Sequence, residues 1–92
     1  MIYLLEDDAG IRELVVYALS EIGLQAEGFD RPSALYAAIQ KEIPSLFLLD
    51  VMLPEEDGFA VLKRLRASGI TANVPIIMLT ARDGEYDKVA AL

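Results

Sequence analysis

The 92-residue chain contains no cysteine and no histidine. It therefore has no disulfide, thiolate nucleophile or cysteine-based zinc site, and no imidazole base or Ser-His-Asp triad. Basic residues are also scarce, with 8 Lys and Arg against 15 Asp and Glu and a net charge of −7. Nucleic-acid surfaces are built from clustered Lys and Arg, so we expect no direct nucleic-acid contact by this segment. The chemistry must use carboxylates, hydroxyls, Lys, Arg or the backbone, and the acidity favours a cation or a basic partner.

Long hydrophobic runs are missing as well. No apolar run approaches the roughly 18 residues of a membrane span, and the N-terminus lacks the basic region and cleavage site of a signal peptide. The apolar fraction of 54% is nevertheless too high for a disordered chain. We therefore expect one small folded domain, located in the cytoplasm and without membrane contact.

Short apolar runs alternate along the chain with segments of helical periodicity. The predicted strands lie at 2–5, 24–29, 46–49 and 75–79. The predicted helices lie at 11–22, after Asp30, at 58–68 and after Asp83. The run at 24–29 has polar alternate residues, which indicates a strand nearer the sheet edge, whereas the third and fourth runs are typical of fully buried strands. The third helix is expected to direct Phe59, Leu62 and Leu65 inward.

Turn and cap residues separate these segments. Asp8 is a predicted N-cap of the first helix and Gly23 its C-terminal stop. Asp30 is the predicted cap of the second helix, with Pro32 in the first turn. Asp57 is the predicted cap of the third helix, at the end of an otherwise solvated acidic loop.

The strand–helix alternation predicts an α/β fold. Strands joined by helical crossovers form right-handed βαβ units, and hence a doubly wound parallel sheet with helices on both faces. In such a sheet ligands bind beyond the carboxyl ends of the strands. Those ends carry Glu6 and Asp7 after the first strand, Asp50 after the third and Thr80 after the fourth.

Carboxylates brought together at one sheet edge repel one another unless a cation joins them. Mg²⁺ suits such a site because it takes a few carboxylates, keeps waters and binds phosphate oxygens. An aspartate beside Mg²⁺ can attack phosphorus to give an aspartyl phosphate. Taken singly, Glu6 and Asp7 are better explained as helix-start residues, and Thr80 as an ordinary strand-end residue. Their joint placement at strand ends favours a site.

Three segments resemble motifs of the receiver domain of bacterial two-component response regulators. They are Ile2-Tyr3-Leu4-Leu5-Glu6-Asp7-Asp8, Leu48-Leu49-Asp50-Val51-Met52-Leu53-Pro54 with Gly58, and Pro75-Ile76-Ile77-Met78-Leu79-Thr80-Ala81. Their order and spacing match the family, the resemblance covers the whole chain, and the details are most similar to receivers of winged-helix transcriptional regulators. The resemblance implies the flavodoxin-like receiver fold with strand order 2-1-3-4-5.

The resemblance also implies a role for each site residue. Glu6, Asp7, Asp50 and the backbone carbonyl of Met52 match the groups that hold Mg²⁺. Asp50 matches the phosphoacceptor and Thr80 the switch hydroxyl. The phosphoryl donor would be a phosphohistidine on a sensor histidine kinase. The domain would be a signalling receiver that catalyses its own phosphorylation and dephosphorylation, rather than an enzyme acting on other substrates.

The family fold continues with a fifth strand, which carries a Lys-Pro pair, and a fifth helix, and the 92 residues contain neither. We therefore predict that residues 1–92 form a partial receiver domain, with apolar side chains of the first and third strands partly bare beside the first helix. Three explanations remain open. The chain belongs to a longer protein, it is a deliberate fragment, or a second copy supplies the cover through a homodimer or a domain-swapped dimer.

Two other functions compete with a phosphorylation-controlled switch. The first is a non-switching interaction module with the receiver fold. The second is a phosphotransferase of the haloacid dehalogenase type, which also uses a nucleophilic aspartate at a strand end. That class expects a second aspartate two residues after the nucleophile, where this chain has Met52. The sequence therefore disfavours it.

Overall fold

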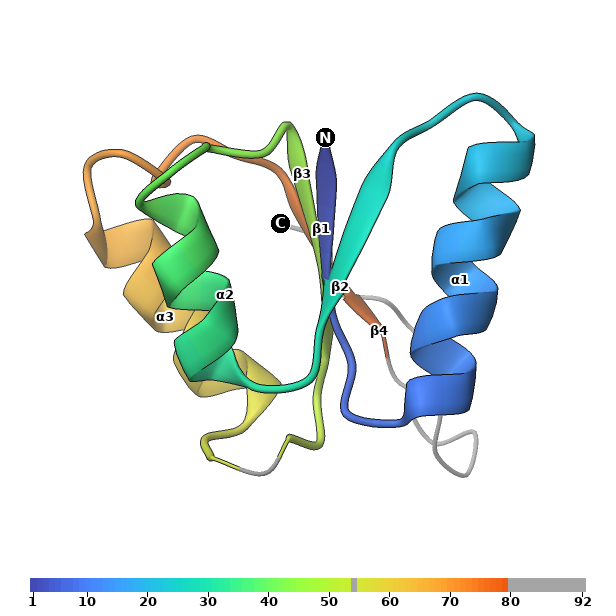
Figure 1. Cartoon of the computed structure of the whole chain (residues 1–92). Helices are drawn as coiled ribbons and strands as arrows, with labels where there is room; N and C mark the ends of the chain where they lie inside the picture. The colour runs from blue at the N-terminus through green and yellow to red at the C-terminus, as the bar shows by residue number, and fades with distance from the viewer. Residues whose placement is uncertain (54, 80–92) are drawn as a thin grey trace.

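The computed structural model describes residues 1–53 and 55–79. Strands and helices alternate through this part of the chain (Figure 1). The strands are β1 (Ile2–Leu5), β2 (Ala26–Phe29), β3 (Leu46–Asp50) and β4 (Ile76–Leu79). The helices are α1 (Ala9–Glu21), α2 (Pro32–Ile39) and α3 (Gly58–Ala67). The helix predicted after Asp83 lies outside the described residues, and every other predicted element is confirmed.

The described strands form one parallel sheet in the order β2-β1-β3-β4. This order agrees with the predicted flavodoxin-like topology. The register pairs Leu5 with Phe29 on one side and with Leu49 on the other, and it pairs Asp50 with Leu79. The carboxyl ends of the strands therefore lie at a common edge, where the residues that follow β1 and β3 come together.

The larger core lies between the sheet and the helices α2 and α3, which cover one face, while α1 covers the other (Figure 1). Successive strand residues point to opposite faces, so the two cores alternate along each strand. In β1, Tyr3 and Leu5 face α2 and α3. Ile2 and Leu4 face α1, together with Leu48 of β3.

The face beside α1 is better covered than predicted. Ile2, Leu4 and Leu48 are 6%, 0% and 9% exposed, so the expectation of bare side chains on β1 and β3 is wrong for these residues. The packing partners come from α1 and from the neighbouring strands: Val15, Val16, Leu19, Ala26, Leu46, Ile77 and Leu79. Within α1 itself no residue is fully buried. Its outer side chains, including Leu14 at 64% exposure, remain in solvent.

The ends of α1 are those predicted. The Asp8 carboxylate accepts a hydrogen bond from the Ile11 backbone N–H at 2.9 Å, which satisfies one of the free donors of the first turn. Gly23 has φ of 90°, a left-handed conformation that glycine adopts at low cost, and it ends the helix.

The predicted cap of α2 is wrong. Asp30 makes a two-point ion pair with Arg31, with N–O distances of 3.0 and 2.9 Å, and Arg31 occupies the N-cap position without a side-chain cap bond. The cap comes from a distant residue instead. Glu55 accepts from the Ser33 backbone N–H at 3.0 Å and from the Ser33 hydroxyl at 3.1 Å. A sequence-local rule could not find this partner, because it lies in the loop after β3.

The cap of α3 is confirmed, and of the residues predicted to face inward Leu65 is buried and Leu62 packs against the core, whereas Phe59 does not. The Asp57 carboxylate accepts from the Ala60 backbone N–H at 2.9 Å. Phe59, predicted to face inward, is 48% exposed, whereas Val61 and Leu65 are 0% and 3% exposed. Gly58 packs against the backbone of Asp50, and this contact sets the rotation of the helix so that positions 58, 61 and 65 face the sheet.

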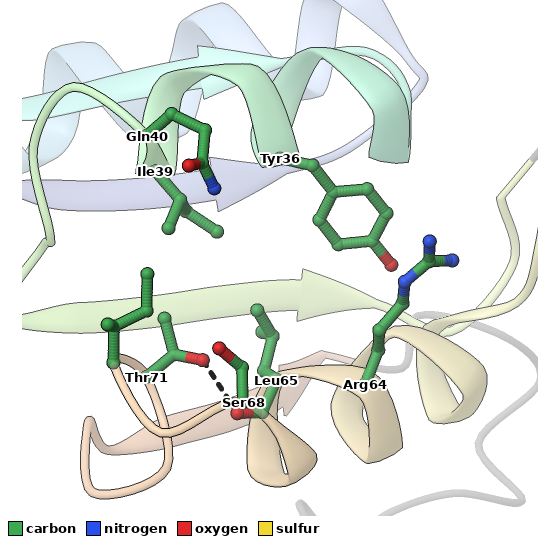
Figure 2. Close-up of a pocket in the computed structure, with 8 residues that line it drawn as sticks. Tyr36, Ile39, Gln40, Arg64, Leu65, Ser68 and Thr71 are labelled. Carbon is green, nitrogen blue, oxygen red and sulfur yellow. Dashed lines mark hydrogen bonds between the residues drawn. The ribbon is translucent and has the colours of Figure 1, made fainter.

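A pocket of about 250 Å³ lies between α2 and α3, away from the carboxyl edge of the sheet (Figure 2). Figure 2 shows Tyr36, Ile39 and Gln40 on the α2 side, opposite Arg64 and Leu65 of α3. Burial, and after it the neighbouring Glu56, raise the pKa of Tyr36 to about 12. The lining carries no carboxylate, so this pocket offers no hard-cation site.

Within residues 1–53 and 55–79, no helix combines the length and the apolar character needed to cross a membrane.

Candidate functional site

Three carboxylates from two strand ends meet at the carboxyl edge of the sheet. Glu6 and Asp7 follow β1, and Asp50 is the last residue of β3. One carboxylate oxygen of each residue lies within 4.8 Å of the others. The parallel pairing of Leu5 with Leu49 produces this convergence, because it places the residues after β1 beside the end of β3.

Glu6 is the buried member of this group. Glu6 is 7% exposed, and its carboxylate accepts a hydrogen bond from the Asp8 backbone N–H at 3.1 Å. The pKa of Glu6 is raised to about 7, mainly because burial disfavours the charged form; the Asp8 hydrogen bond opposes this rise and the negative charge of Asp50 adds to it. A buried carboxylate beside two others is costly as an anion unless a cation neutralises it.

The raised pKa of Glu6 predicts a pH-dependent stability in metal-free protein. The folded state holds the Glu6 proton more tightly than the unfolded state. The stabilisation of the folded state that results is complete below pH 4.5 and is lost as the pH rises to about 7. We expect Glu6→Gln to reduce the dependence of the unfolding free energy on pH between these limits. Urea unfolding across this pH range in a chelating buffer measures the effect.

Glu13 provides the matched control for this prediction, because it lies on the exposed surface of α1. Glu13→Gln removes the same charge, and its unfolding free energy should change with pH at the wild-type slope. A Glu6→Gln protein whose slope equals that of the wild type would contradict the assigned environment of Glu6.

Asp50 is half-buried and its backbone is closely packed. Its carboxylate accepts a long hydrogen bond of 3.4 Å from the Met52 backbone N–H. A Cβ atom added to Gly58 would overlap the Asp50 carbonyl oxygen and lie 3.0 Å from its carbonyl carbon. The Gly58 N–H also donates to the Val51 carbonyl at 2.8 Å. The start of α3 therefore fixes the backbone that carries Asp50.

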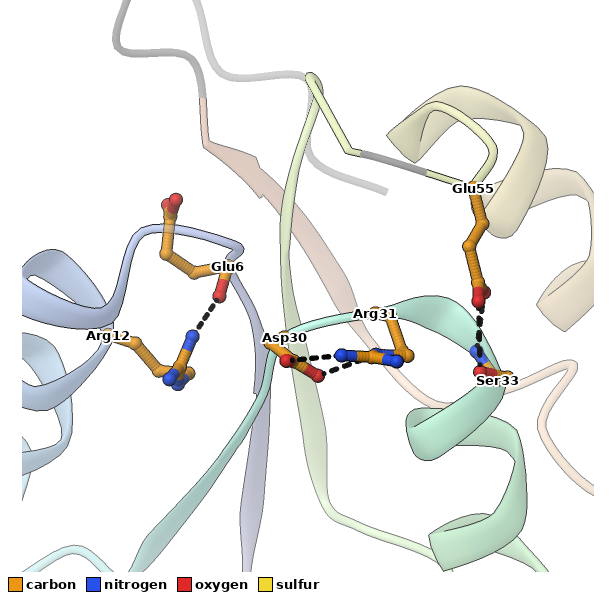
Figure 3. Close-up of polar contacts among 6 residues, drawn as sticks. All are labelled: Glu6, Arg12, Asp30, Arg31, Ser33 and Glu55. Atoms are coloured by element: carbon orange, nitrogen blue, oxygen red, sulfur yellow. Dashed lines mark hydrogen bonds and ion pairs between the residues drawn. The ribbon is translucent and has the colours of Figure 1, made fainter.

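The acidic loop before α3 is held by hydrogen bonds, although Glu55 and Asp57 are exposed, as predicted for a solvated loop. Glu55 caps α2 through Ser33 (Figure 3). Glu56 accepts from the Tyr36 hydroxyl and from Arg64, each at 3.2 Å, and the Arg64 guanidinium lies 4.5 Å from the centre of the Tyr36 ring. These contacts attach the loop after Asp50 to α2.

Arg12 is a second residue that the sequence reasoning missed. Its guanidinium donates to the Glu6 carbonyl oxygen at 2.9 Å (Figure 3). The only sequence signal was Gly28 in the middle of β2, since a glycine inside a strand often marks a close approach of another group. The Arg12 side chain makes that approach.

Three predicted site features are not tested by these contacts. Thr80 lies outside the described residues, as does Pro54, a residue of the motif that follows Asp50. Met52 is 53% exposed, and the role of its backbone carbonyl stays a prediction. Glu6, Asp7 and Asp50 are brought together as predicted.

The donor set has the composition that suits a hard divalent cation. It consists of carboxylate oxygens, which Mg²⁺ and Ca²⁺ prefer, and the sequence has no Cys or His to supply a thiolate or imidazole ligand. Mg²⁺ keeps several waters and needs only a few carboxylates. The three side chains therefore fit a magnesium site.

The response regulator receiver domain model matches residues 2–92 of the chain. The transcriptional regulatory protein GltR of Pseudomonas aeruginosa is 44% identical over 91 residues, which are 99% of this chain and 38% of GltR. The phosphate regulon transcriptional regulatory protein PhoB of Escherichia coli is 40% identical over 92 residues, or 99% of this chain and 40% of PhoB. The chain thus spans about two fifths of the length of these relatives.

Solved structures resemble the described fold closely. The N-terminal domain of a response regulator receiver protein from Methanoculleus marisnigri superposes with a TM-score of 0.84 at 27% identity, over 94% of this chain and 70% of that one. The chemotaxis response regulator CheY4 of Vibrio cholerae gives a TM-score of 0.84 at 26% identity, over 95% and 72% of the two chains.

Proposed function

The chain belongs to the response regulator receiver domain family, and on that premise we propose that it accepts a phosphoryl group on Asp50 in a magnesium-dependent reaction. The observation that carries this proposal is the gathering of the Glu6, Asp7 and Asp50 carboxylates within 4.8 Å of one another at the carboxyl edge of the sheet. The reaction uses a nucleophilic carboxylate and oxygen ligands for a cation, and these residues offer both.

Asp50 is the nucleophile in this proposal. One of its carboxylate oxygens forms a bond to phosphorus while the phosphorus–nitrogen bond of a sensor-kinase phosphohistidine breaks and the imidazole keeps the electron pair. The product is an acyl phosphate on Asp50. The contact between Gly58 and the Asp50 backbone holds the nucleophile in a fixed position, which lowers the entropic cost of the reaction.

Glu6, Asp7, Asp50 and the Met52 backbone carbonyl are the proposed ligands of Mg²⁺. The bound ion neutralises the carboxylates and the phosphoryl oxygens and positions them. Asp7 is exposed and Asp50 half-buried, so both can reach such an ion. Glu6, the buried member of the set, adds the third carboxylate.

The consequence of phosphorylation is proposed from the family and from the names of the relatives. Thr80, which follows β4 in the sequence, is the proposed switch hydroxyl. The acyl phosphate would shift a two-state equilibrium that controls an output or a dimer interface. GltR and PhoB are named as transcriptional regulatory proteins, and we propose that this chain is the partial receiver domain (residues 1–92) of such a cytoplasmic regulator. Its upstream partner is a sensor histidine kinase.

Asp7→Asn tests the metal site. We expect the Mg²⁺ dissociation constant to rise by about 10-fold or more, because a direct ligand is weakened. The matched control is Asp8→Asn, which removes the same charge one residue away and keeps the N-cap, since Asn caps helices as well as Asp. Backbone-amide NMR titrations with MgCl₂ give both affinities. An equal affinity in the two variants would place the metal elsewhere.

Incubation with acetyl phosphate and Mg²⁺ tests the proposed function as a whole. We expect the intact protein to gain one phosphoryl group that hydroxylamine removes, as it removes acyl phosphates. A protein that binds Mg²⁺ but never gains the group would support the alternative, a non-switching interaction module with the receiver fold.

A further inference from the structure

Hydrogen bonds hold Glu6 through its backbone and its side chain. Its N–H donates to the Phe29 carbonyl of β2 at 3.0 Å, and its carboxylate accepts from the Asp8 N–H at 3.1 Å. Its carbonyl oxygen accepts from the Arg12 guanidinium at 2.9 Å. The first two bonds come from the sheet ladder and from the local turn. Only the third comes from a side chain of another element, α1.

The path of the Arg12 side chain depends on Gly28. A Cβ atom at Gly28 would lie 2.5 Å from Arg12 Cγ and 2.9 Å from Arg12 Cδ, with Val16 Cγ2 at 3.6 Å. The first two distances are too short for real carbon contacts, so any larger residue at position 28 would displace the aliphatic part of Arg12. In the sheet register Gly28 pairs with Leu4, two residues before Glu6. The glycine therefore provides the space through which the guanidinium reaches Glu6.

The electrostatic surroundings favour this placement of the guanidinium. Asp30 lies near it at the end of β2 (Figure 3). Its pKa is lowered mainly by the hydrogen bonds from Arg31, and the charge of Arg12 adds a smaller contribution. A hydrogen bond from a charged donor to a carbonyl is stronger than a neutral one. Half-buried Arg12 therefore restrains the backbone from which both Glu6 and Asp7 project.

We propose that Arg12, in the space left by Gly28, is a positioning residue that holds the Glu6–Asp7 segment in the geometry required for divalent-cation binding. This inference rests on the proposed function of the site and adds a determinant outside the carboxylates. Groups that orient metal ligands without touching the ion typically contribute about 10- to 100-fold in metal affinity.

The direction in which Mg²⁺ affinity changes when Arg12 is replaced distinguishes a positioning role from a purely electrostatic one. Removal of a nearby positive charge should by itself strengthen cation binding. Loss of the positioning bond should weaken it. We expect Arg12→Met, which keeps the aliphatic part of the side chain, to raise the Mg²⁺ dissociation constant about 10-fold. Arg12→Lys, which keeps the charge and a donor, should recover part of the affinity.

Arg66 is the matched control. It also donates from a helix to backbone carbonyls, those of Ala72 and Val74 at 2.9 and 2.7 Å, and these residues precede β4 at the opposite edge of the sheet. Arg66→Met should leave Mg²⁺ affinity within about twofold of the wild type, an effect well below the 10-fold expected of a positioning residue. This comparison separates a specific effect on the site from general destabilisation.

Gly28→Ala provides a second, independent variant. It should weaken Mg²⁺ binding when Arg12 is present, because the added methyl group displaces the arginine. In an Arg12→Ala background it should have no further effect, so the two substitutions should be strongly non-additive. Additive effects would show that Gly28 acts on the site by another route and would overturn this part of the proposal.

The deciding experiment compares wild type, Arg12→Met and Arg66→Met, first without metal and then with MgCl₂. Without metal, amide hydrogen exchange at Glu6 and Asp8 should be faster in Arg12→Met alone. With MgCl₂, NMR titration should show weaker binding in that variant. Unchanged exchange, or unchanged or tighter Mg²⁺ binding, would overturn the proposal. A wild type that binds no Mg²⁺ would instead overturn the proposed function, and the metal-free exchange would still decide whether Arg12 holds the segment.

Discussion

Asp50→Asn is expected to reduce phosphoryl incorporation from acetyl phosphate to the level of a blank without protein. Asparagine lacks the anionic oxygen that attacks phosphorus, and no other described carboxylate in the cluster ends a strand in the same position. The fold should persist, because the amide oxygen can still accept the hydrogen bond from the Met52 N–H. The unfolding free energy should equal that of the wild type or exceed it, since the change relieves repulsion among three carboxylates.

The matched control for Asp50→Asn is Asp57→Asn in the following loop. Asp57 caps α3 through the Ala60 N–H, and Asn is an equally good N-cap. This variant has the same charge change and should incorporate phosphoryl groups at the wild-type level. Intact-mass measurement and hydroxylamine sensitivity give both results. An Asp50→Asn protein that gains hydroxylamine-sensitive phosphoryl groups as the wild type does would show that Asp50 is not the acceptor.

Gly58→Ala is expected to destabilise the protein by about 2 to 3 kcal/mol, the range of severe overpacking. A Cβ atom there would overlap the Asp50 carbonyl oxygen and lie 2.9 Å from Met78 Cε. Met78 is 1% exposed and the backbone at Asp50 belongs to β3, so neither can move freely. Backbone conformational preference alone predicts that the substitution stabilises the protein, since Gly→Ala at a compatible position raises the unfolding free energy by about 0.4 to 1 kcal/mol.

Gly69 is the matched control for this prediction, because a Cβ atom added to it would meet no described atom within 4 Å beyond its chain neighbours. Gly69→Ala should change the unfolding free energy by no more than about 0.5 kcal/mol. Urea unfolding measures both variants. A Gly58→Ala protein as stable as the wild type would show that the contact between α3 and Asp50 is loose. Asp50 would then not be a rigidly held nucleophile.

The features that the sequence predicted correctly depend on local rules. Alternation of apolar runs and helical periodicity led to the parallel sheet, and acidic residues at strand ends led to the cluster of Glu6, Asp7 and Asp50. The caps Asp8 and Asp57 were also predicted, because each acts within its own first turn. The caps are visible in a single sequence because each cap and its partner are a few positions apart, whereas the cluster follows from the rule that the carboxyl ends of parallel strands form one binding edge.

The features that it missed depend on tertiary contacts. Asp30 pairs with Arg31 while Glu55, 22 positions beyond Ser33, caps α2. Phe59 faces solvent because the contact of Gly58 with β3 sets the rotation of α3. The raised pKa of Glu6 follows from burial, and Arg12 reaches its carbonyl past a strand glycine. None of these follows from the periodicity of one segment.

The most direct test of the account locates the phosphoryl group. The protein is incubated with acetyl phosphate in the presence of Mg²⁺ or of a chelator, and its intact mass and its peptides are then analysed. We expect a gain of one phosphoryl group that depends on Mg²⁺ and is carried by the peptide that contains Asp50. Modification of another residue, or equal modification in the chelator, would contradict the claim that the carboxylate cluster is a magnesium-dependent phosphoacceptor site.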